Sequence, residues 1–387
     1  YGLLLRSLPL VIFSLSLRPF ITAVGPVLPE IRQDLGISAT TAGLLTVAPV
    51  ICFAIGAFIA PATLRMLSPN RSIALALILL SIGGIVRLLG TSNLLLIGTI
   101  LCGLGAALGN VVGGVIARRD FSLKLGLVMG LYVAAISVSA AAAEIISYPI
   151  FEIFDSWKHP LGLWTLIALA TLILWLVSQR NHPTDQPMTG RTSYRYLLRN
   201  PIAWALVLYF GFQSTNFHSL AGWLPSILRD AGISATTAGA MTSAMILLGV
   251  PTGLVVPILS ARFTSQRFLV FLIATSSLIG LSGILLIPTS LTWIWIFCLG
   301  LGIGSSFPLA LTMTLTKSDS AETARDLNAF MQSWGYVISA MGPIALGAIW
   351  DATGKWSWAL LALIFGTMIQ MISGMAVGGR GEIHTER

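Results

Sequence analysis

The sequence predicts an all-α membrane protein of twelve transmembrane helices, arranged as two parallel six-helix repeats. Three observations predict this fold. The chain of 387 residues is 56% hydrophobic and only 9% charged, whereas about a quarter of the residues are charged in an ordinary soluble domain. Apolar runs of about 20 residues, the length that crosses a bilayer as a helix, recur between short polar breaks. The octapeptide GISATTAG occurs at 36–43 and again at 232–239, an offset of 196 positions that is half the chain.

The repeat extends beyond the octapeptide on both sides. At the same offset the matching pairs are Leu28 and Leu224, Pro29 and Pro225, Ile31 and Ile227, Asp34 and Asp230, Pro61 and Pro257, and Arg71 and Arg267. Chance does not place prolines and a basic residue in register with a repeated octapeptide. The chain is therefore two copies of one structural unit that point the same way through the membrane.

Each half contains six predicted spans, in which internal Gly and Pro are expected because both are common in membrane helices. In the first half the spans are 3–28, 43–64, 72–89, 94–117, 125–150 and 161–177. In the second half they are 203–228, 239–259, 268–287, 291–315, 328–350 and 358–375. The first is too long for a cleavable signal peptide.

The polar stretch 179–200 separates the two halves and contains Pro183, Pro187 and several arginines. Such a composition is typical of a linker. The sequence thus predicts an N-terminal bundle over 1–178, a cytoplasmic linker over 179–200, and a C-terminal bundle with a short cytoplasmic tail over 201–387.

Basic residues separate when the loops are assigned alternately to two sides. One side receives Arg6, Arg65, Arg71, Arg118, Arg119, Lys124, Arg180, Arg191, Arg195, Arg199, Arg262, Arg267, Lys317, Arg325, Arg380 and Arg387. The other side receives Arg32, Arg87, Lys158, Arg229 and Lys355. The excess predicts that both termini are cytoplasmic in a multi-pass protein of the bacterial inner membrane. Most tryptophans, Trp157 and Trp356 among them, fall near span ends and are expected to be interfacial anchors.

Arg18 is the basic residue left over, and it lies near the middle of the first span. An arginine there costs roughly 2.5 to 3.5 kcal/mol on insertion scales, so something must compensate for it. One interpretation is a structural ion pair with Glu144, the acidic residue that lies well inside a span. The interpretation we favour is that Arg18 binds a substrate anion or a dipolar substrate oxygen.

The offset of 196 maps Arg18 onto Ser214. The seventh span therefore carries Gln213, Ser214, Asn216 and His218 at the depth where the first carries Arg18. Such clustering in an apolar helix indicates a cavity wall. The imidazole of His218 either carries a proton that accompanies an anion or stays neutral and makes a hydrogen bond across the bundle. Glu144 is the second candidate for proton coupling.

Further substrate-binding candidates share an intramembrane depth near these polar groups. They are the polar residues Asn110 and Gln332 and the aromatic residues Tyr132, Phe217, Phe307, Phe330 and Trp334. The chain shows no metal-ligand spacing, catalytic triad or paired carboxylates, so we expect neither an enzyme nor a cofactor or metal. The net charge of +8 is explained by membrane orientation and does not indicate nucleic acid. We expect a monomer in the lipid bilayer.

Four short sequence motifs support a resemblance to a known family. They are LRPFITAVGPVLPEI at 17–31, RRDF at 118–121, GWLPSIL at 222–228 and AFMQSWGY at 329–336. The twelve-helix repeat resembles the major facilitator superfamily over the whole chain, and these motifs resemble those of its cyanate and 2-nitroimidazole transporter family. The resemblance implies alternating access, and a central cavity lined by the first, fourth, seventh and tenth helices, which places Arg18, Asn110 and His218 at the cavity. It also implies a cytoplasmic gate at Arg118, Arg119 and Asp120.

The chain departs from the family pattern at three places. The family tends to have a proline shortly before RRDF, where this chain has Gly114. The loop 61–71 keeps its arginines but has no acidic residue, which puts the usual gate ion pair in doubt. The fifth span lacks a Gly-Pro exporter motif, which weakens a case for drug export. Three hypotheses remain: a secondary active transporter of a small anion or small polar solute, an exporter of neutral or nitroaromatic compounds, and a membrane sensor or assembly factor that transports nothing. A sensor would need an output domain, and neither the linker nor the tail is long enough to fold into one.

Overall fold

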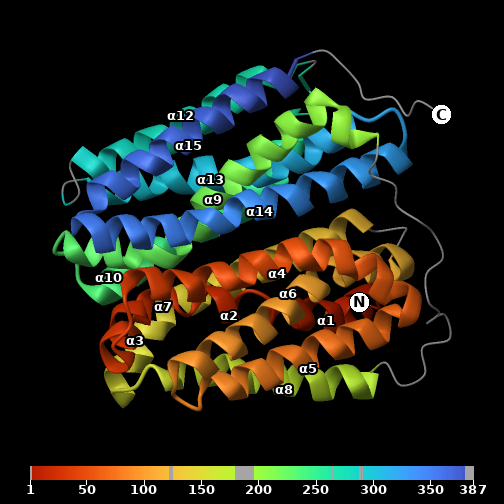
Figure 1. Ribbon diagram of the computed structural model, residues 1–387. Coiled ribbons are helices and arrows are strands. Elements are labelled where there is room, and N and C mark those ends of the chain that lie inside the picture. The colour runs from red at the N-terminus through yellow and green to blue at the C-terminus, as the bar shows by residue number, and fades with distance from the viewer. Residues whose placement is uncertain are drawn as a thin grey trace. The chain divides into compact units, whose positions relative to one another are not determined.

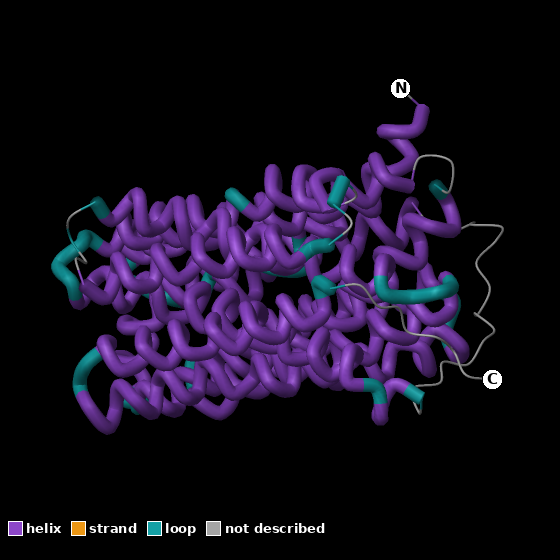
Figure 2. Tube along the Cα trace, turned by 90° about the horizontal axis from the view of Figure 1, so that it is seen from above, coloured by secondary structure: helices purple, strands orange, loops and turns teal. Residues whose placement is uncertain are grey.

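The structure is a computed structural model that describes residues 2–121, 125–178, 196–260, 262–263, 265–286, 289 and 291–379. Figure 2 shows this part of the chain as helices joined by short loops. The chain divides into two compact units, 1–190 and 191–387, and each is described by itself. Most of the predicted linker lies outside the described residues; its last five residues, 196–200, are described.

The first unit runs from red to yellow in Figure 1. Its elements are α1 (Gly2–Leu15), α2 (Pro19–Thr22), the 3-10 turn η1 (Gly25–Val27), α3 (Leu28–Leu35), α4 (Ala39–Met66), α5 (Pro69–Arg87), α6 (Ser92–Asp120), α7 (Leu125–Phe154) and α8 (Lys158–Ser178).

The second unit runs from green to blue. Its elements are the 3-10 turn η3 (Leu197–Arg199), α9 (Pro201–Asp230), α10 (Ala235–Leu247), α11 (Gly249–Ser260), α12 (Arg267–Leu286), α13 (Thr292–Thr316), α14 (Ala321–Thr353) and α15 (Trp356–Val377).

The predicted spans correspond to these helices. Ten stretches of the described chain are long and apolar enough to cross a membrane, and two of them, Ser7–Leu35 and Ala235–Ser260, join successive helices. The other two predicted spans are α9 and α14, which are 30 and 33 residues long but more polar. The described chain is therefore all-helical, and its ten candidate spans together with α9 and α14 correspond to the twelve spans that the sequence predicts.

The first span is not one continuous helix, contrary to the expectation from its apolar run. It ends as α1 at Leu15 and restarts as α2 and η1 before α3. Pro19 and Pro26 lack the backbone N–H that a helix ladder needs, which explains the two interruptions. At the repeat offset α9 carries Thr215 and Gly222 instead, and it continues unbroken. The two copies of the unit thus differ at the depth of Arg18.

The repeated octapeptide has the same structural role in both halves. Gly36 ends α3 with φ +62°, and Gly232 follows α9 with φ +92°, a left-handed conformation that favours glycine. Two residues later Ser38 accepts a hydrogen bond from the amide of Thr41 at 3.1 Å, and Ser234 accepts one from the amide of Thr237 at 3.2 Å. Both serines are N-caps of the next helix. The octapeptide encodes a tight helix-to-helix turn.

A second contact recurs just before this turn. The indole Nε1 of Trp157 donates to Asp34 at 2.7 Å, and the indole of Trp356 donates to Asp230 at 2.7 Å. Trp157 is 3% exposed and Trp356 8% exposed, so the expectation that these two tryptophans are interfacial anchors is wrong. In each unit the pair ties the end of the first span to the start of the sixth.

Candidate functional site

Arg18 lies at the interruption of the first span. It is the N-cap residue of α2 and is half-buried. Its guanidinium carbon lies 5.1 Å from the ring centroid of Phe53 on α4, within the range of a cation–π contact. The break in the helix therefore places a permanent positive charge inside a membrane-spanning segment, against an aromatic face.

Tyr132 on α7 belongs to the same neighbourhood. It is 3% exposed, its hydroxyl donates to the carbonyl of Gly109 on α6 at 3.3 Å, and it lies within the electrostatic reach of Arg18. Asn110 follows Gly109 and is half-buried, and its amide hydrogen-bonds none of the described residues. Arg18, Phe53 and Tyr132 thus converge from three elements of the first unit, and Asn110 offers an uncommitted amide on α6.

Glu144 on α7 does not form the ion pair with Arg18 that we considered as the structural alternative. Its side chain is completely buried, and neither carboxyl oxygen has a hydrogen-bond partner among the described residues. A carboxylate buried without partners costs several kcal/mol or more. The described residues thus supply no hydrogen bond that would compensate for an ionised carboxylate at Glu144.

In the second unit His218 lies between α9 and α14. It is 4% exposed, and its Nδ1 is 2.8 Å from the carbonyl of Ser214 and 3.3 Å from the hydroxyl of Ser339. Because a carbonyl oxygen can only accept, Nδ1 carries the hydrogen in this contact. The serine hydroxyl of the neighbouring helix also approaches the ring, so this imidazole joins the two helices.

The polar residues of the seventh span do not all face the same neighbour. Asn216 is 2% exposed and donates to Thr367 on α15 at 2.9 Å, away from the partner that His218 uses. This divergence follows from helix geometry, since two residues span about 200° around the axis. Gln213 is buried, and its amide hydrogen-bonds none of the described residues. Phe217 lies one turn from Gln213 and is half-buried.

Two candidates on α14 are placed differently from the buried polar set. Gln332 is half-buried and donates to Asn328 on its own helix at 3.1 Å. Trp334 is 37% exposed, and its ring centroid lies 5.6 Å from that of Trp204. Of the two remaining aromatic candidates, Phe307 contacts Phe210 and Phe330 contacts Trp204.

The three residues of the expected gate lie in the last turn of α6 rather than in a loop. Arg119 forms a bidentate pair with Asp120 at 2.6 and 2.9 Å, and it also donates to the amide oxygen of Asn70 at 3.0 Å. Arg118 is exposed. Asn70, which lies in the first turn of α5, thus supplies a neutral acceptor for Arg119 from the stretch 61–71 that lacks an acidic residue.

Two buried polar contacts were missed by the sequence analysis. Arg87, which we assigned to a loop, is the last residue of α5 and is 1% exposed. Gln370 on α15 donates to Ser306 on α13 at 2.9 Å. The signal was available for both, because each is a polar residue within a predicted span. Among the described residues, no three His, Cys, Asp or Glu side chains are grouped so as to hold a metal ion.

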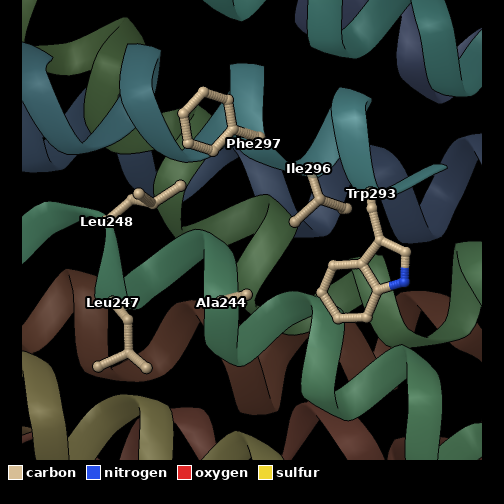
Figure 3. Close-up of a pocket in the computed structure, with 6 residues that line it drawn as sticks. All are labelled: Ala244, Leu247, Leu248, Trp293, Ile296 and Phe297. Carbon is tan, nitrogen blue, oxygen red and sulfur yellow. The ribbon is translucent and has the colours of Figure 1, made fainter. Parts of the chain in front are cut away.

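One cavity of the second unit involves none of the predicted residues. It has a volume of about 330 Å³ and lies between α10 and α13, lined by Ala244, Leu247, Leu248, Trp293, Ile296 and Phe297. Figure 3 shows that carbon atoms of these side chains surround it. Leu247, Trp293 and Phe297 are 41 to 53% exposed, so the cavity opens to the surface of this unit. It offers a small polar solute almost no hydrogen-bond partner.

Comparison with known proteins places the chain among membrane transporters. A family model described as the Major Facilitator Superfamily matches residues 10–343. The transporter YycB of Bacillus subtilis (strain 168) is 35% identical over 95% of this chain and 92% of that protein. The cyanate transport protein CynX of Escherichia coli (strain K12) is 33% identical over 94% and 95%. The 2-nitroimidazole transporter of the same organism is 30% identical over 95% and 94%.

Solved structures show the same fold at much lower identity. The nucleoside transporter NupG aligns with a TM-score of 0.80 over 96% of this chain and 100% of that one, at 11% identity. A D-xylose-proton symporter aligns with a TM-score of 0.74 over 96% and 95%, at 12% identity. The all-helical fold, the membrane-crossing segments and the family match agree, and the chain belongs to the Major Facilitator Superfamily.

Proposed function

We propose that this protein is a secondary active transporter that moves a small anion or small polar solute, similar to cyanate, by alternating access. The observation that carries the proposal is the position of Arg18, a permanent cation at a break in a membrane-spanning helix. The 33% identity to a cyanate transport protein supports the choice of solute. The membrane is the bacterial inner membrane, with both termini in the cytoplasm, and the protein acts as a monomer.

A guanidinium in a low-dielectric environment favours an anion strongly, because the attraction is far less screened than in water. Interrupted membrane helices also expose backbone groups that bind polar solutes. Tyr132 lies within the electrostatic reach of Arg18, and its hydroxyl donates to Gly109, the residue that precedes Asn110. In this proposal Arg18 makes the main electrostatic contact, and the amide of Asn110, which hydrogen-bonds none of the described residues, makes a hydrogen bond. Gln213 of the second unit stays a predicted contact.

The other predicted contact residues also belong to the proposal, and they differ in what each must do to reach the solute. Phe217 and Trp334 would supply aromatic surface, and Gln332 would first have to leave Asn328. Asn216 is engaged by Thr367, so it would contribute only after a rotamer change. Arg118, Arg119 and Asp120 would form the cytoplasmic gate, with Asn70 as an additional acceptor.

Two buried titratable groups are candidates for a coupled proton. Glu144 is completely buried without a hydrogen-bond partner among the described residues, which suits a carboxyl that holds a proton. His218 is buried and contacts Ser214 and Ser339. Movement of a proton with the anion would neutralise the charge that is carried across the membrane.

A second candidate function is export of neutral or nitroaromatic compounds. The 30% identity to a 2-nitroimidazole transporter favours it, and Arg18 would then donate to a nitro oxygen. Cyanate and a nitro group both present hydrogen-bond acceptor atoms, but cyanate is an anion and a nitro group is neutral. The choice between the two functions therefore depends on whether the solute carries a charge.

A ligand-stabilisation screen on the purified full chain tests both functions. Ligand at about 100 times its Kd stabilises a protein by about 2.7 kcal/mol, so we expect sodium cyanate to raise the Tm of the parent by several degrees. Arg18→Ala should lose this shift, and Arg65→Ala, which removes an exposed arginine, should keep it. Equal stabilisation of Arg18→Ala would contradict the proposal. Stabilisation by 2-nitroimidazole alone would favour the second function.

A further inference from the structure

The most deeply buried charge of the first unit is Arg87. It ends α5 and is 1% exposed. Arginine is almost never fully buried unless it is paired, because the cost of removing its charge from water is large. Its Nη1 donates to the carbonyl oxygen of Phe20 at 2.8 Å, while Nε and Nη2 have no hydrogen-bond partner among the described residues. The bond to Phe20 is thus the main compensation for burying this guanidinium.

The acceptor of this bond lies in the short helix that follows Arg18. α2 has four residues, Pro19–Thr22, so the carbonyl of Phe20 belongs to the last turn, where helical carbonyls lack partners in the ladder. A buried carbonyl at such a position needs a donor from elsewhere. Arg87 supplies that donor from another membrane-spanning helix. Its acceptor, Phe20, lies two residues along the chain from Arg18, the proposed solute contact.

The position of Arg87 is itself fixed by the packing of α5 against α6. A Cβ atom added to Gly98 on α6 would lie 2.6 Å from Cγ of Arg87 and 2.8 Å from its backbone nitrogen. Only a glycine therefore leaves room for the stem of Arg87. Cys102, one turn further along α6, lies beside the guanidinium. The arginine is held by these neighbours before it reaches Phe20.

A second contact anchors the same short helix from the other side. The hydroxyl of Thr22 donates to the carbonyl of Ala140 on α7 at 3.0 Å. α2 is therefore fastened to α5 through Arg87 and to α7 through its own threonine. If either hydrogen bond is lost, a helix of four residues has little intrinsic stability to hold its position.

We propose that Arg87 is a positioning residue that fixes α2, and through it the location of Arg18. This inference rests on the proposed function, because it assigns Arg87 the task of presenting the solute-binding cation. Arg87 does not contact the solute. Its loss should weaken binding through a displaced Arg18, whereas a residue with only a packing role would lower stability and leave affinity unchanged.

The test compares Arg87→Met, Arg87→Gln, Arg87→Lys and Leu80→Ala in the purified full chain. Met keeps the length of the stem without a donor, Gln is too short to reach Phe20, and Lys restores one donor. Leu80 is fully buried on the same helix and serves as a control for loss of packing. Two quantities are measured: the Kd for cyanate by calorimetry, and hydrogen–deuterium exchange of the backbone amides in 19–27.

We expect Arg87→Met and Arg87→Gln to weaken cyanate binding about tenfold and to speed exchange in 19–27 about tenfold, as for a lost hydrogen bond to a charged group. Arg87→Lys should recover most of both, and Leu80→Ala should lower the Tm with parental affinity and exchange. Should Arg87→Met not fold, Arg87→Gln gives the same comparison. Parental exchange and affinity in the Arg87 variants would overturn the inference. Faster exchange in a protein that binds no cyanate would support it and count against the proposed function alone.

Discussion

Arg18 and Arg87 both lie in predicted spans of the first unit, but their surroundings differ. Arg18 is half-buried beside the ring of Phe53, whereas Arg87 is 1% exposed and bonded to a backbone carbonyl. The first arrangement leaves part of the Arg18 side chain exposed, as the proposed contact with a solute requires. The second ties the charge to the fold. The residue type alone did not distinguish the two roles, because both arginines lie in predicted spans.

Glu144 gives a prediction at the scale of one residue. Because its carboxyl is buried without a hydrogen-bond partner among the described residues, we expect it to be the neutral acid, which a glutamine closely resembles in shape and charge. Glu144→Gln should therefore change the Tm by no more than about 2 °C. If Glu144 carries the coupled proton, the same variant should abolish cyanate-driven acidification of proteoliposomes, measured with a trapped pH dye.

Glu152→Gln on the same helix is the matched control, since Glu152 is exposed. It should retain acidification. A drop in Tm of ten degrees or more in Glu144→Gln would show instead that the carboxylate is ionised and paired. Unchanged acidification in a stable Glu144→Gln would remove Glu144 from proton coupling and leave His218 as the candidate.

At the scale of elements, the interruption of the first span decides where the predicted site lies. Pro19 and Pro26 were visible in the sequence, yet the apolar run predicted one helix, because hydropathy records composition and not backbone donors. The orientation of side chains around α9 was also beyond sequence reasoning. Asn216 and His218 are two residues apart and face different helices, and the identity of those neighbours is set only by tertiary packing.

The packing of α6 against α7 gives a prediction with an adjacent control. A Cβ atom at Gly113 would overlap the hydroxyl of Tyr132 and lie 2.6 Å from its ring carbon Cζ, whereas one at Gly114 would meet nothing within 4 Å. Tyr132 is rigid and buried, so it cannot yield cheaply. Overpacking costs about 1 to 3 kcal/mol, and alanine gains up to about 1 kcal/mol over glycine in a helix.

We therefore expect Gly113→Ala to lower the Tm by several degrees and to weaken cyanate binding, because Tyr132 moves. Gly114→Ala should melt at or slightly above the parental temperature. Thermal unfolding of the two purified variants under identical conditions makes the comparison. Equal melting of the pair would show that the contact between Tyr132 and α6 is not as close as the structure has it.

At the scale of the whole molecule, the duplication was the most informative property of the sequence. It predicted twelve spans and their order, and the helices of the described chain correspond to these spans. Glycine and serine in each octapeptide end one helix and begin the next. What the duplication could not predict is the contact between Asp34 and Trp157 and its counterpart in the second unit. The two aspartates are related by the offset of 196, but the two tryptophans are related by an offset of 199. The tryptophans are therefore not paired when the copies are aligned, and the alignment does not predict these contacts.

The candidate site was predictable in part for the same reason. Arg18 was found as the basic residue left over when the loops were assigned to two sides, and alignment of the copies then placed His218 and its neighbours at the same depth. Arg87 was not found, because a residue at the predicted end of a span is assigned to solvent unless the burial is known. Neither copy of the repeat identifies the substrate, so binding and transport measurements are needed to identify it.

The central claim is that Arg18 binds the transported solute, and uptake of radiolabelled cyanate into proteoliposomes tests it most directly. The parent, Arg18→Ala, Arg18→Lys and the exposed-site control Arg199→Ala are reconstituted at equal density, and initial rates are measured over a range of cyanate concentrations. We predict at least a tenfold loss of uptake in Arg18→Ala, partial uptake in Arg18→Lys because the charge remains without its planar donors, and parental uptake in Arg199→Ala. Uptake by Arg18→Ala at parental rate and affinity would contradict the claim.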